Sequence, residues 1–307
     1  MSESRPILRF VSRPGMDPFG VSRSIYCLSI AGRPLHQHIV DAFTAGTPCS
    51  DPILWIDDPA LQRDEDAMAQ LRERGRVILT AGDEDASQAV HTSTFPVPGG
   101  APLRFDYPWD LLAITRAVLS ALPPRISPDA MIENGVEIDG HVTIEDGVRV
   151  LSGARLKGPV YLGARTFVGN NASVRGASSV GADSVIGAAA DVKNSLVGPG
   201  AGIGTLCFVG DSVFDERVWL AGVARTTNTR LDSGTVSVFV GDVKVDTGMK
   251  SLGVFVGADV QIGSNVLILP GRKVGARTLI GPHVIVDKNI APRTRVTLLQ
   301  QWSVTDL

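Results

Sequence analysis

Between residues 126 and 192, every sixth residue of the chain is aliphatic. A period of six fits neither an α-helix, which repeats every 3.6 residues, nor a single β-strand, which alternates every two. It is the hexapeptide pattern of a parallel β-helix, in which the aliphatic side chain points into the core. The twelve positions are Ile126, Ile132, Ile138, Ile144, Val150, Leu156, Leu162, Val168, Val174, Val180, Ile186 and Val192.

Three hexads form one triangular coil of about 18 residues, so this run predicts about four coils. The pattern slips by one residue near Leu196 and Val197, continues through Ile203 and Val209, and returns between residues 256 and 286. Each coil buries its core only against its neighbours. The hexads are therefore scaffold, and we expect a mainly β fold.

The residues before the repeat follow a different pattern. Residues 1–107 lack the period of six and alternate short apolar runs with helix-like segments, which predicts a small α/β domain. A linker helix is expected within residues 108–124, because Pro108 suits the first turn of a helix and Pro123-Pro124 would stop it. The small domain would therefore join the β-helix through this helix.

The β-helix itself is expected over residues 125–296, with one interruption. Between residues 223 and 250 the hexads vanish, and two alternating segments flank Gly241-Asp242, which predicts an inserted hairpin. We expect this insertion to hang off the prism, where it could touch a neighbouring subunit. Residues 297–307 are expected to form a C-terminal tail.

Composition narrows the classes of partner. A net charge of −3 at pH 7 gives no reason to expect a nucleic acid or a membrane surface. No apolar stretch reaches the length of about 18 residues that a transmembrane helix needs. The first residues also lack the apolar core of a signal peptide. The three cysteines are far apart in the sequence, which favours reduced thiols and a cytoplasmic location.

Several short motifs are typical of one known family. The segment that starts at Ile30 and reads Ile-Ala-Gly-Arg-Pro-Leu resembles a segment of sugar-phosphate nucleotidyltransferases, and Pro108-Trp-Asp-Leu-Leu resembles the join in their two-domain members. Val192-Lys-Asn-Ser, Val209-Gly-Asp-Ser and Asp246-Thr-Gly resemble the β-helix of the bifunctional uridylyltransferase/acetyltransferases that make UDP-N-acetylglucosamine. The resemblance implies a left-handed β-helix, acetyl-CoA or another acyl-CoA as the cofactor, and a homotrimer with active sites where subunits meet.

The chain departs from this family at both of its catalytic centres. The Gly-rich loop and the following lysine that hold a nucleotide triphosphate are absent, so we do not expect nucleotidyl transfer. In the acetyl-transfer motifs, Thr205 replaces the histidine that acts as general base, and Phe208 replaces a tyrosine. Trp219 stands in place of an asparagine, and Ser251 in place of a lysine, with Lys250 one residue earlier. A threonine cannot act as a base near pH 7.

A cationic pair is retained. Arg175 and Lys193 fall where the family's sugar-phosphate-binding arginine and lysine fall. They are 18 residues apart, and Lys157 lies another 18 residues before Arg175, so the three should stack on one face at about 4.8 Å per coil. Like charges on adjacent strands repel, and the ladder therefore predicts a site for a phosphate-bearing ligand. The alternative is a solvated edge whose side chains splay apart or form ion pairs across a subunit boundary.

Two further residues are candidates for a site. His283 lies at an expected coil corner, where a histidine is either a surface residue or a substitute for the missing catalytic base. Trp219 would either cap the former acceptor pocket or stack on a new ligand. A zinc site built from three histidines is not expected, because the β-helix contains only His141 and His283, far apart in sequence.

The sequence is compatible with two functions. The first is a divergent acyltransferase-type protein that acts on or binds a phosphorylated or nucleotide-linked sugar, with substrate-binding residues Lys157, Arg175, Lys193 and Trp219. The second is a non-catalytic sugar-phosphate-binding or scaffold protein that has lost both nucleotidyl and acetyl transfer. The missing base favours the second function, and the retained cations are compatible with either.

Overall fold

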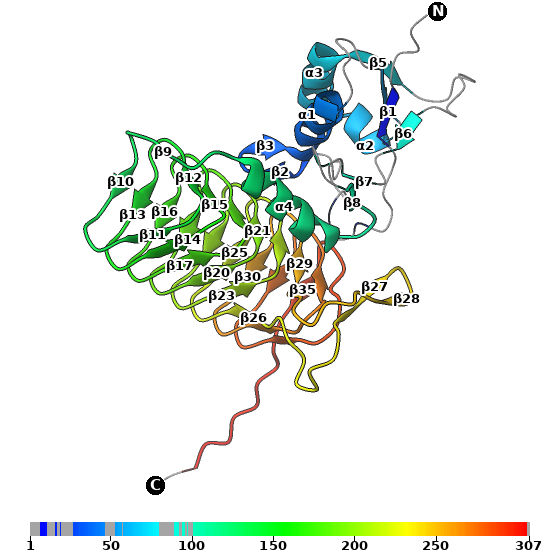
Figure 1. Cartoon of the computed structure of the whole chain (residues 1–307). Helices are drawn as coiled ribbons and strands as arrows, with labels where there is room; N and C mark the ends of the chain where they lie inside the picture. The colour runs from blue at the N-terminus through cyan, green and yellow to red at the C-terminus, as the bar shows by residue number, and fades with distance from the viewer. Residues whose placement is uncertain are drawn as a thin grey trace, which may run out of the picture.

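The structure, a computed structural model, describes residues 7–10, 16, 19, 27–46, 53–56, 58–79, 89–91, 94–95, 97 and 101–305. It contains a left-handed parallel β-helix, preceded by a small α/β unit and the single helix α4 (Figure 1). The fold class expected from the period of six is therefore confirmed. Among the described residues, no helix is both long and apolar enough to span a membrane.

The β-helix has three parallel sheets, one on each face of a triangular prism. Face one consists of β10 (Met131–Ile132), β13 (Arg149–Val150), β16 (Phe167–Val168), β19 (Val185–Ile186), β22 (Gly202–Ile203), β25 (Trp219–Leu220), β30 (Gln261–Ile262), β33 (Leu279–Ile280) and β35 (Arg295–Val296). Face two consists of β11 (Glu137–Asp139), β14 (Arg155–Lys157), β17 (Ser173–Arg175), β20 (Asp191–Lys193), β23 (Phe208–Gly210), β26 (Arg225–Thr226), β31 (Leu267–Ile268) and β34 (Ile285–Val286). Face three consists of β9 (Arg125–Ile126), β12 (Val142–Ile144), β15 (Val160–Leu162), β18 (Ser178–Val180), β21 (Leu196–Val197), β24 (Val213–Phe214), β29 (Phe255–Val256) and β32 (Lys273–Val274).

The hexad residues form the core of the prism. On face three, Ile144 pairs with Leu162 and Leu162 pairs with Val180, and all three side chains are fully buried. Val180 then pairs with Val197, 17 residues later, so the slip in the sequence pattern is one coil that is shorter by a residue. At the corners, neighbouring coils approach closely. A Cβ atom on Gly163 would lie 2.4 Å from the backbone nitrogen of Ala182 in the next coil, which explains the glycine.

The N-terminal unit is a small α/β structure. Four parallel strands are ordered β5 (Arg76–Leu79), β4 (Ile53–Ile56), β1 (Ile7–Phe10) and β6 (Ala89–His91). The helices are α1 (Leu35–Gly46), α2 (Pro59–Gln62) and α3 (Glu65–Arg74), and two antiparallel pairs join β2 (Ser29–Ile30) to β3 (Arg33–Pro34) and β7 (Thr94–Phe95) to β8 (Leu103–Arg104). The loop that would hold a nucleotide triphosphate falls mostly outside the described residues.

Face three is covered by the chain's own N-terminal part. Helix α4 (Asp110–Ala121) buries an apolar stripe in one cluster with the outward-facing side chains Tyr161, Leu196, Val213 and Phe255. The backbone nitrogen of Ala31, in the β2–β3 turn, donates a 3.0 Å hydrogen bond to Ser179 Oγ on the same face. Faces one and two are therefore the faces left for ligands or for other copies of the chain.

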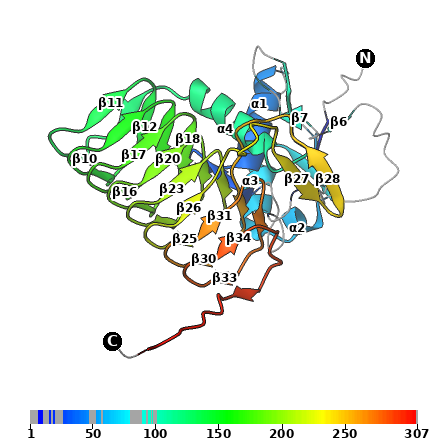
Figure 2. The same cartoon turned by 90° about the horizontal axis from the view of Figure 1, so that it is seen from below.

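The inserted segment leaves the prism after β26 and returns at β29. Its hairpin pairs β27 (Ser237–Val240) with β28 (Val243–Asp246). Val236 and Val238 are buried in the same cluster as Leu252 and Phe255, so this segment packs against its own chain along one side. Figures 1 and 2 both show the hairpin beside the last coils of the prism.

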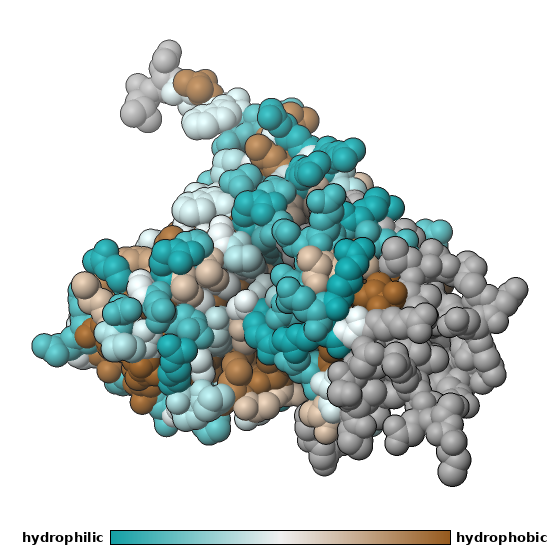
Figure 3. Space-filling model, turned by 90° about the horizontal axis from the view of Figure 1, so that it is seen from above, coloured by the Kyte–Doolittle hydropathy of each residue, from teal (hydrophilic) through white to brown (hydrophobic). Residues whose placement is uncertain are grey.

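The C-terminal tail runs away from the end of the prism (Figure 2). Leu299 and Trp302 in this tail are almost fully exposed. Figure 3 shows a mixed surface on the face opposite to that of Figure 2, with hydrophobic patches between hydrophilic side chains and the tail projecting from the body.

Candidate functional site

The three predicted cations stack on face two. Lys157 on β14 pairs in register with Arg175 on β17, and Arg175 pairs with Lys193 on β20. Parallel neighbours in a sheet lie about 4.8 Å apart, so the expected ladder of side chains is present. We call these three residues the cation ladder.

Carboxylates interleave with the cation ladder. Arg175 makes two hydrogen bonds to Asp191, at 3.0 and 2.8 Å, and these raise the pKa of its guanidinium. Lys193 Nζ lies 3.2 Å from Asp211, and Lys157 Nζ lies 3.9 Å from Asp139. The expected repulsion between the cations is therefore offset by ion pairs within the chain. The pairs of Lys157 and Arg175 are near solvent and contribute only about 0–1 kcal/mol each, so an incoming anion competes there with weak partners, whereas the partner of Lys193 is buried.

Asp211 connects the cation ladder to the inserted segment. Its side chain is only 6% exposed and accepts hydrogen bonds from Lys193 at 3.2 Å, Asn194 at 2.7 Å and Asn228 at 2.6 Å. Asn228 belongs to the start of the inserted segment. Asp211 therefore joins the cation ladder to that segment, a link that the Gly-Asp-Ser motif alone does not reveal.

Trp219 lies on a different face from the cation ladder. It belongs to β25 on face one and pairs with Gly202 of the preceding coil. A Cβ atom on Gly202 would lie 2.1 Å from the indole, so the ring lies flat over that glycine, and the side chain remains 46% exposed. Within one chain, a single ligand would have to reach around a corner of the prism to contact both Trp219 and the ladder.

Thr205, which the resemblance aligns with the family's catalytic base, is exposed at the corner between faces one and two. His283 lies on the same corner but three coils further along, because backbone hydrogen bonds connect Val223 to Thr205, Asn265 to Gly222 and His283 to Ser264. At about 4.8 Å per coil, the separation is roughly 14 Å. Within one chain, His283 therefore does not take the place of the missing base. The described residues contain no cluster of three or more metal-ligating side chains.

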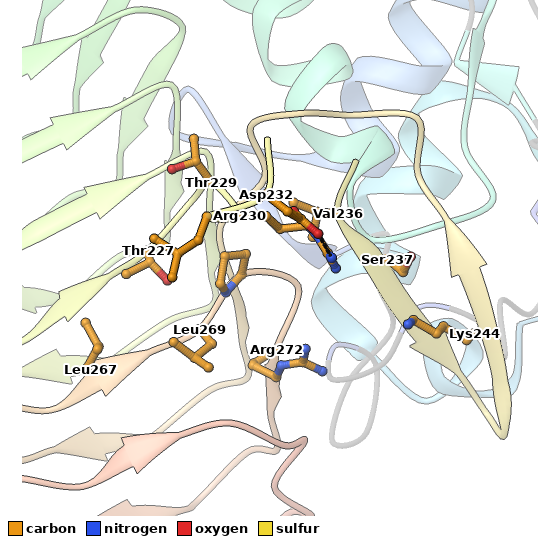
Figure 4. Close-up of a pocket in the computed structure, with 12 residues that line it drawn as sticks. Thr227, Thr229, Arg230, Asp232, Val236, Ser237, Lys244, Leu267, Leu269 and Arg272 are labelled. Atoms are coloured by element: carbon orange, nitrogen blue, oxygen red, sulfur yellow. Dashed lines mark hydrogen bonds and ion pairs between the residues drawn. The ribbon is translucent and has the colours of Figure 1, made fainter. Parts of the chain in front are cut away.

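A pocket of about 550 Å³ lies between the inserted segment and face two (Figure 4). We call it the insertion pocket. Two of its residues, Thr227 and Leu269, lie in the same column of face two as the cation ladder. Lys193 pairs with Gly210, and the register of the next two strands places Thr227 and then Leu269 after Gly210 in that column. The full lining is Thr227, Thr229, Arg230, Leu231, Asp232, Val236, Ser237, Lys244, Leu267, Leu269, Pro270 and Arg272.

The insertion pocket contains more cations than carboxylates. Arg230 is paired with Asp232, and that pair lowers the pKa of the aspartate. Arg272 and Lys244 form no ion pair with any described residue, and Figure 4 shows both side chains at the pocket between the coils and the hairpin. Nε of Arg272 is shielded from solvent without a hydrogen-bond partner in the described part of the chain. Burying such a donor unsatisfied costs about 1–3 kcal/mol.

The sequence alone does not reveal this pocket, for a physical reason. Arg230, Lys244 and Arg272 share no period, and two of them lie in a segment that breaks the hexad pattern. The usable signal was that the insertion carries two cations, Arg230 before its hairpin and Lys244 in the second strand of that hairpin. Only the fold of the insertion places them beside Arg272, which lies immediately before β32.

Comparison with known proteins supports the resemblance that the β-helix motifs indicated. A bifunctional protein GlmU of Methanococcus maripaludis is 42% identical over 199 residues, which is 65% of this chain and 48% of that protein. GlmU of Methanococcus vannielii is 36% identical over 183 residues, 60% of this chain and 44% of its own length. The resemblance to GlmU-type proteins that the motifs indicated is confirmed. An uncharacterized acetyltransferase of Escherichia coli, YaiX, is 39% identical over 106 residues, 34% of this chain and 46% of that protein.

These similarities have a limited reach. The chain spans about half the length of the curated GlmU relatives that it matches. No family model matches it. The similarities therefore support an acyltransferase-type β-helix protein, while the substrates and the activity of this chain have to be argued from its own residues.

Proposed function

We propose that this acyltransferase-type β-helix protein binds a phosphorylated or nucleotide-linked sugar through Lys157, Arg175 and Lys193, and transfers an acyl group from an acyl-CoA to it. The observation that carries the proposal is the register of the three cations on one open face of the prism. The resemblance to GlmU-type proteins also implies that Arg175 and Lys193 correspond to the arginine and lysine that bind a sugar phosphate in them.

The cation ladder has the chemistry that a phosphate needs. A guanidinium binds two phosphate oxygens at once, and an ammonium group adds a compact positive charge. The side chains of Arg175 and Lys193 are 41% and 32% exposed, so a ligand can reach both. The bound anion would exchange places with Asp191 at the guanidinium, at little cost because that pair is close to solvent.

A homotrimer would complete this site. Face three is covered by the chain's own helix α4, whereas face one exposes Met131, Val185, Trp219 and Leu279 to solvent. Apolar residues gathered on one face favour association with another copy. If face one of one subunit meets face two of the next, the indole of Trp219 comes close to a neighbouring cation ladder. The two groups that one chain keeps apart would then contact the same ligand.

The described residues do not fit the proton transfer that GlmU-type acetylation from acyl-CoA requires. The acceptor has to lose a proton as it attacks a thioester, and Thr205 is not a base near pH 7. Thr205 therefore cannot take up the proton of the acceptor. An acceptor amine with a low pKa could react without a strong base, which is the form of acyl transfer that this site supports.

Thr205 favours a second candidate function, a non-catalytic protein that binds a sugar phosphate or serves as a scaffold. Both candidates share the cation ladder and differ in turnover. In either case a cytoplasmic location stays a prediction.

Thermal unfolding with a panel of sugar phosphates and nucleotide sugars tests the shared site. A ligand at a hundredfold excess over its Kd stabilises the fold by about 2.7 kcal/mol, which corresponds to a rise of roughly 5–10 °C in Tm. We expect this rise for the wild type and for Arg295→Ala, an exposed cation on face one, but not for Arg175→Ala. If no compound in the panel raises the Tm of the wild type, the ladder is not a phosphate site.

A thiol-release assay separates the two candidates. With acetyl-CoA and glucosamine-1-phosphate we expect no turnover at the level of GlmU-type enzymes, because general-base catalysis contributes roughly 10²–10⁴-fold. Thiol release with another acceptor from the panel would favour the transferase, and binding without any release would favour the non-catalytic protein. Turnover near about 10 s⁻¹ with glucosamine-1-phosphate would contradict our assignment of the missing base.

A further inference from the structure

We propose that the insertion pocket is a second anion site, which binds an organic phosphate that carries a nucleoside-like apolar portion. The proposal concerns residues outside the cation ladder and does not depend on the proposed function. It rests on the charge of the pocket, on its apolar wall and on its position along face two.

The charge of the insertion pocket selects an anion. Its lining has three cations, Arg230, Lys244 and Arg272, and one carboxylate, Asp232, which leaves a net charge of 3 − 1 = +2. Asp232 is already held by Arg230, so Lys244 and Arg272 are the cations open to a ligand. They come from the hairpin and from the coil that faces it (Figure 4). A guanidinium and an ammonium group on opposite sides of a pocket form a clamp for a phosphate.

The apolar wall of the insertion pocket favours a phosphate ligand that also has an apolar portion. Val236, Leu267, Leu269 and Pro270 line it with apolar surface. Its volume of about 550 Å³ lies within the usual range of small-molecule sites, about 300–1,000 Å³. Inorganic phosphate would leave this apolar surface in contact with water, whereas the base of a nucleotide would cover it. We therefore infer that a nucleotide binds more tightly than inorganic phosphate.

The pocket lies close to the cation ladder but remains separate from it. Thr227 is two strands beyond Lys193 in the same column, a distance of roughly 10 Å. The residue between them is Gly210, which places no side chain in that column. A long ligand could span both sites, and a short one would occupy the insertion pocket alone.

Isothermal titration calorimetry with the full chain tests the proposal. The probes are adenosine 3′,5′-bisphosphate, uridine diphosphate and inorganic phosphate, because the first resembles the phosphate-bearing end of a coenzyme A and the second resembles that of a nucleotide sugar. We expect at least one nucleotide to bind, and to bind at least about tenfold more tightly than inorganic phosphate. The nucleotide that binds more tightly identifies the source of the ligand.

Variants assign the binding to this pocket. We expect Lys244→Gln combined with Arg272→Gln to weaken the nucleotide by about tenfold or more, a loss of about 1.4 kcal/mol per factor of ten. Arg295→Gln, an exposed cation on face one, is the control and should leave the Kd within about twofold. A ligand that spans both sites would lose affinity with Lys193→Gln as well as with the double variant, and this also supports the pocket.

Two results would overturn the proposal. One is that neither nucleotide binds the wild type at concentrations up to about 5 mM, which corresponds to a binding free energy weaker than roughly 3 kcal/mol. The other is an unchanged Kd in the double variant. Lys244 is exposed on the hairpin, so Lys244→Gln alone keeps the fold and provides the same comparison if Arg272→Gln unfolds the chain.

Discussion

Replacing Asp211 with alanine tests whether this carboxylate holds the cation ladder and the inserted segment together. The side chain is 6% exposed and accepts hydrogen bonds from Lys193, Asn194 and Asn228. Its backbone φ is +50°, and alanine tolerates that conformation less well than aspartate. The substitution therefore removes three partners at once and adds some strain.

The magnitude follows from the exposure of those partners. Removing one member of a fully buried ion pair costs about 3–5 kcal/mol. Lys193 is about one-third exposed, so water compensates its charge in part and the electrostatic loss is smaller. The two asparagines lose hydrogen bonds worth about 1 kcal/mol each. We expect a total loss of about 2–4 kcal/mol, which for a β-helix of this size lowers Tm by roughly 5–12 °C.

Thermal unfolding monitored by circular dichroism measures this loss. The matched control is Asp183→Ala, which removes an exposed carboxylate that also has a positive φ and an ion pair, with Arg165. We expect the Tm of the control to fall only slightly. If Asp211→Ala melts at the same temperature as Asp183→Ala, burial and the three hydrogen bonds do not give Asp211 the role that we assign to it.

Three further predictions follow from the fold. Burial raises the pKa of Tyr161 to about 12, so the folded state favours the neutral phenol. The contribution of Tyr161 to the free energy of unfolding is therefore fully present below the unfolded pKa of about 10. It falls by roughly 3 kcal/mol as the pH rises to 12. Urea titrations at high pH should show this loss in the wild type and much less of it in Tyr161→Phe. Gly163→Ala should cost about 1–3 kcal/mol, because its Cβ would meet the backbone of Ala182 at 2.4 Å, whereas Gly222→Ala, whose Cβ would have ordinary contacts, should melt near the wild type. Light scattering should give a homotrimer at micromolar concentration, and a stable monomer would rule out the shared site between faces one and two.

Much of the scaffold could be predicted from the sequence because the hexad is a local rule. Each aliphatic residue has to reach the same core from one coil to the next, so the period of six fixes which residues pair. Leu162 and Val180 are paired and buried as the period requires, and the slip near Leu196 is one coil of 17 residues. The same rule placed Lys157, Arg175 and Lys193 in one column.

The partners of the site residues could not be predicted in this way. The ion pairs of Arg175 with Asp191 and of Lys193 with Asp211 depend on how side chains lean across neighbouring strands, which the period does not specify. The position of Trp219 on a different face from the ladder follows from the coil count, but its contact with Gly202 depends on the indole lying flat over that residue.

By itself, the sequence determined the β-helix, its register and the cation ladder, because a repeat makes every coil a copy of the last. The tertiary structure decided which faces stay open and where the insertion pocket forms. Face three is closed by helix α4, and Lys244 meets Arg272 because the inserted segment folds back on the prism. The residues in these contacts share no sequence period. The contacts form because they lower the free energy of the fold as a whole.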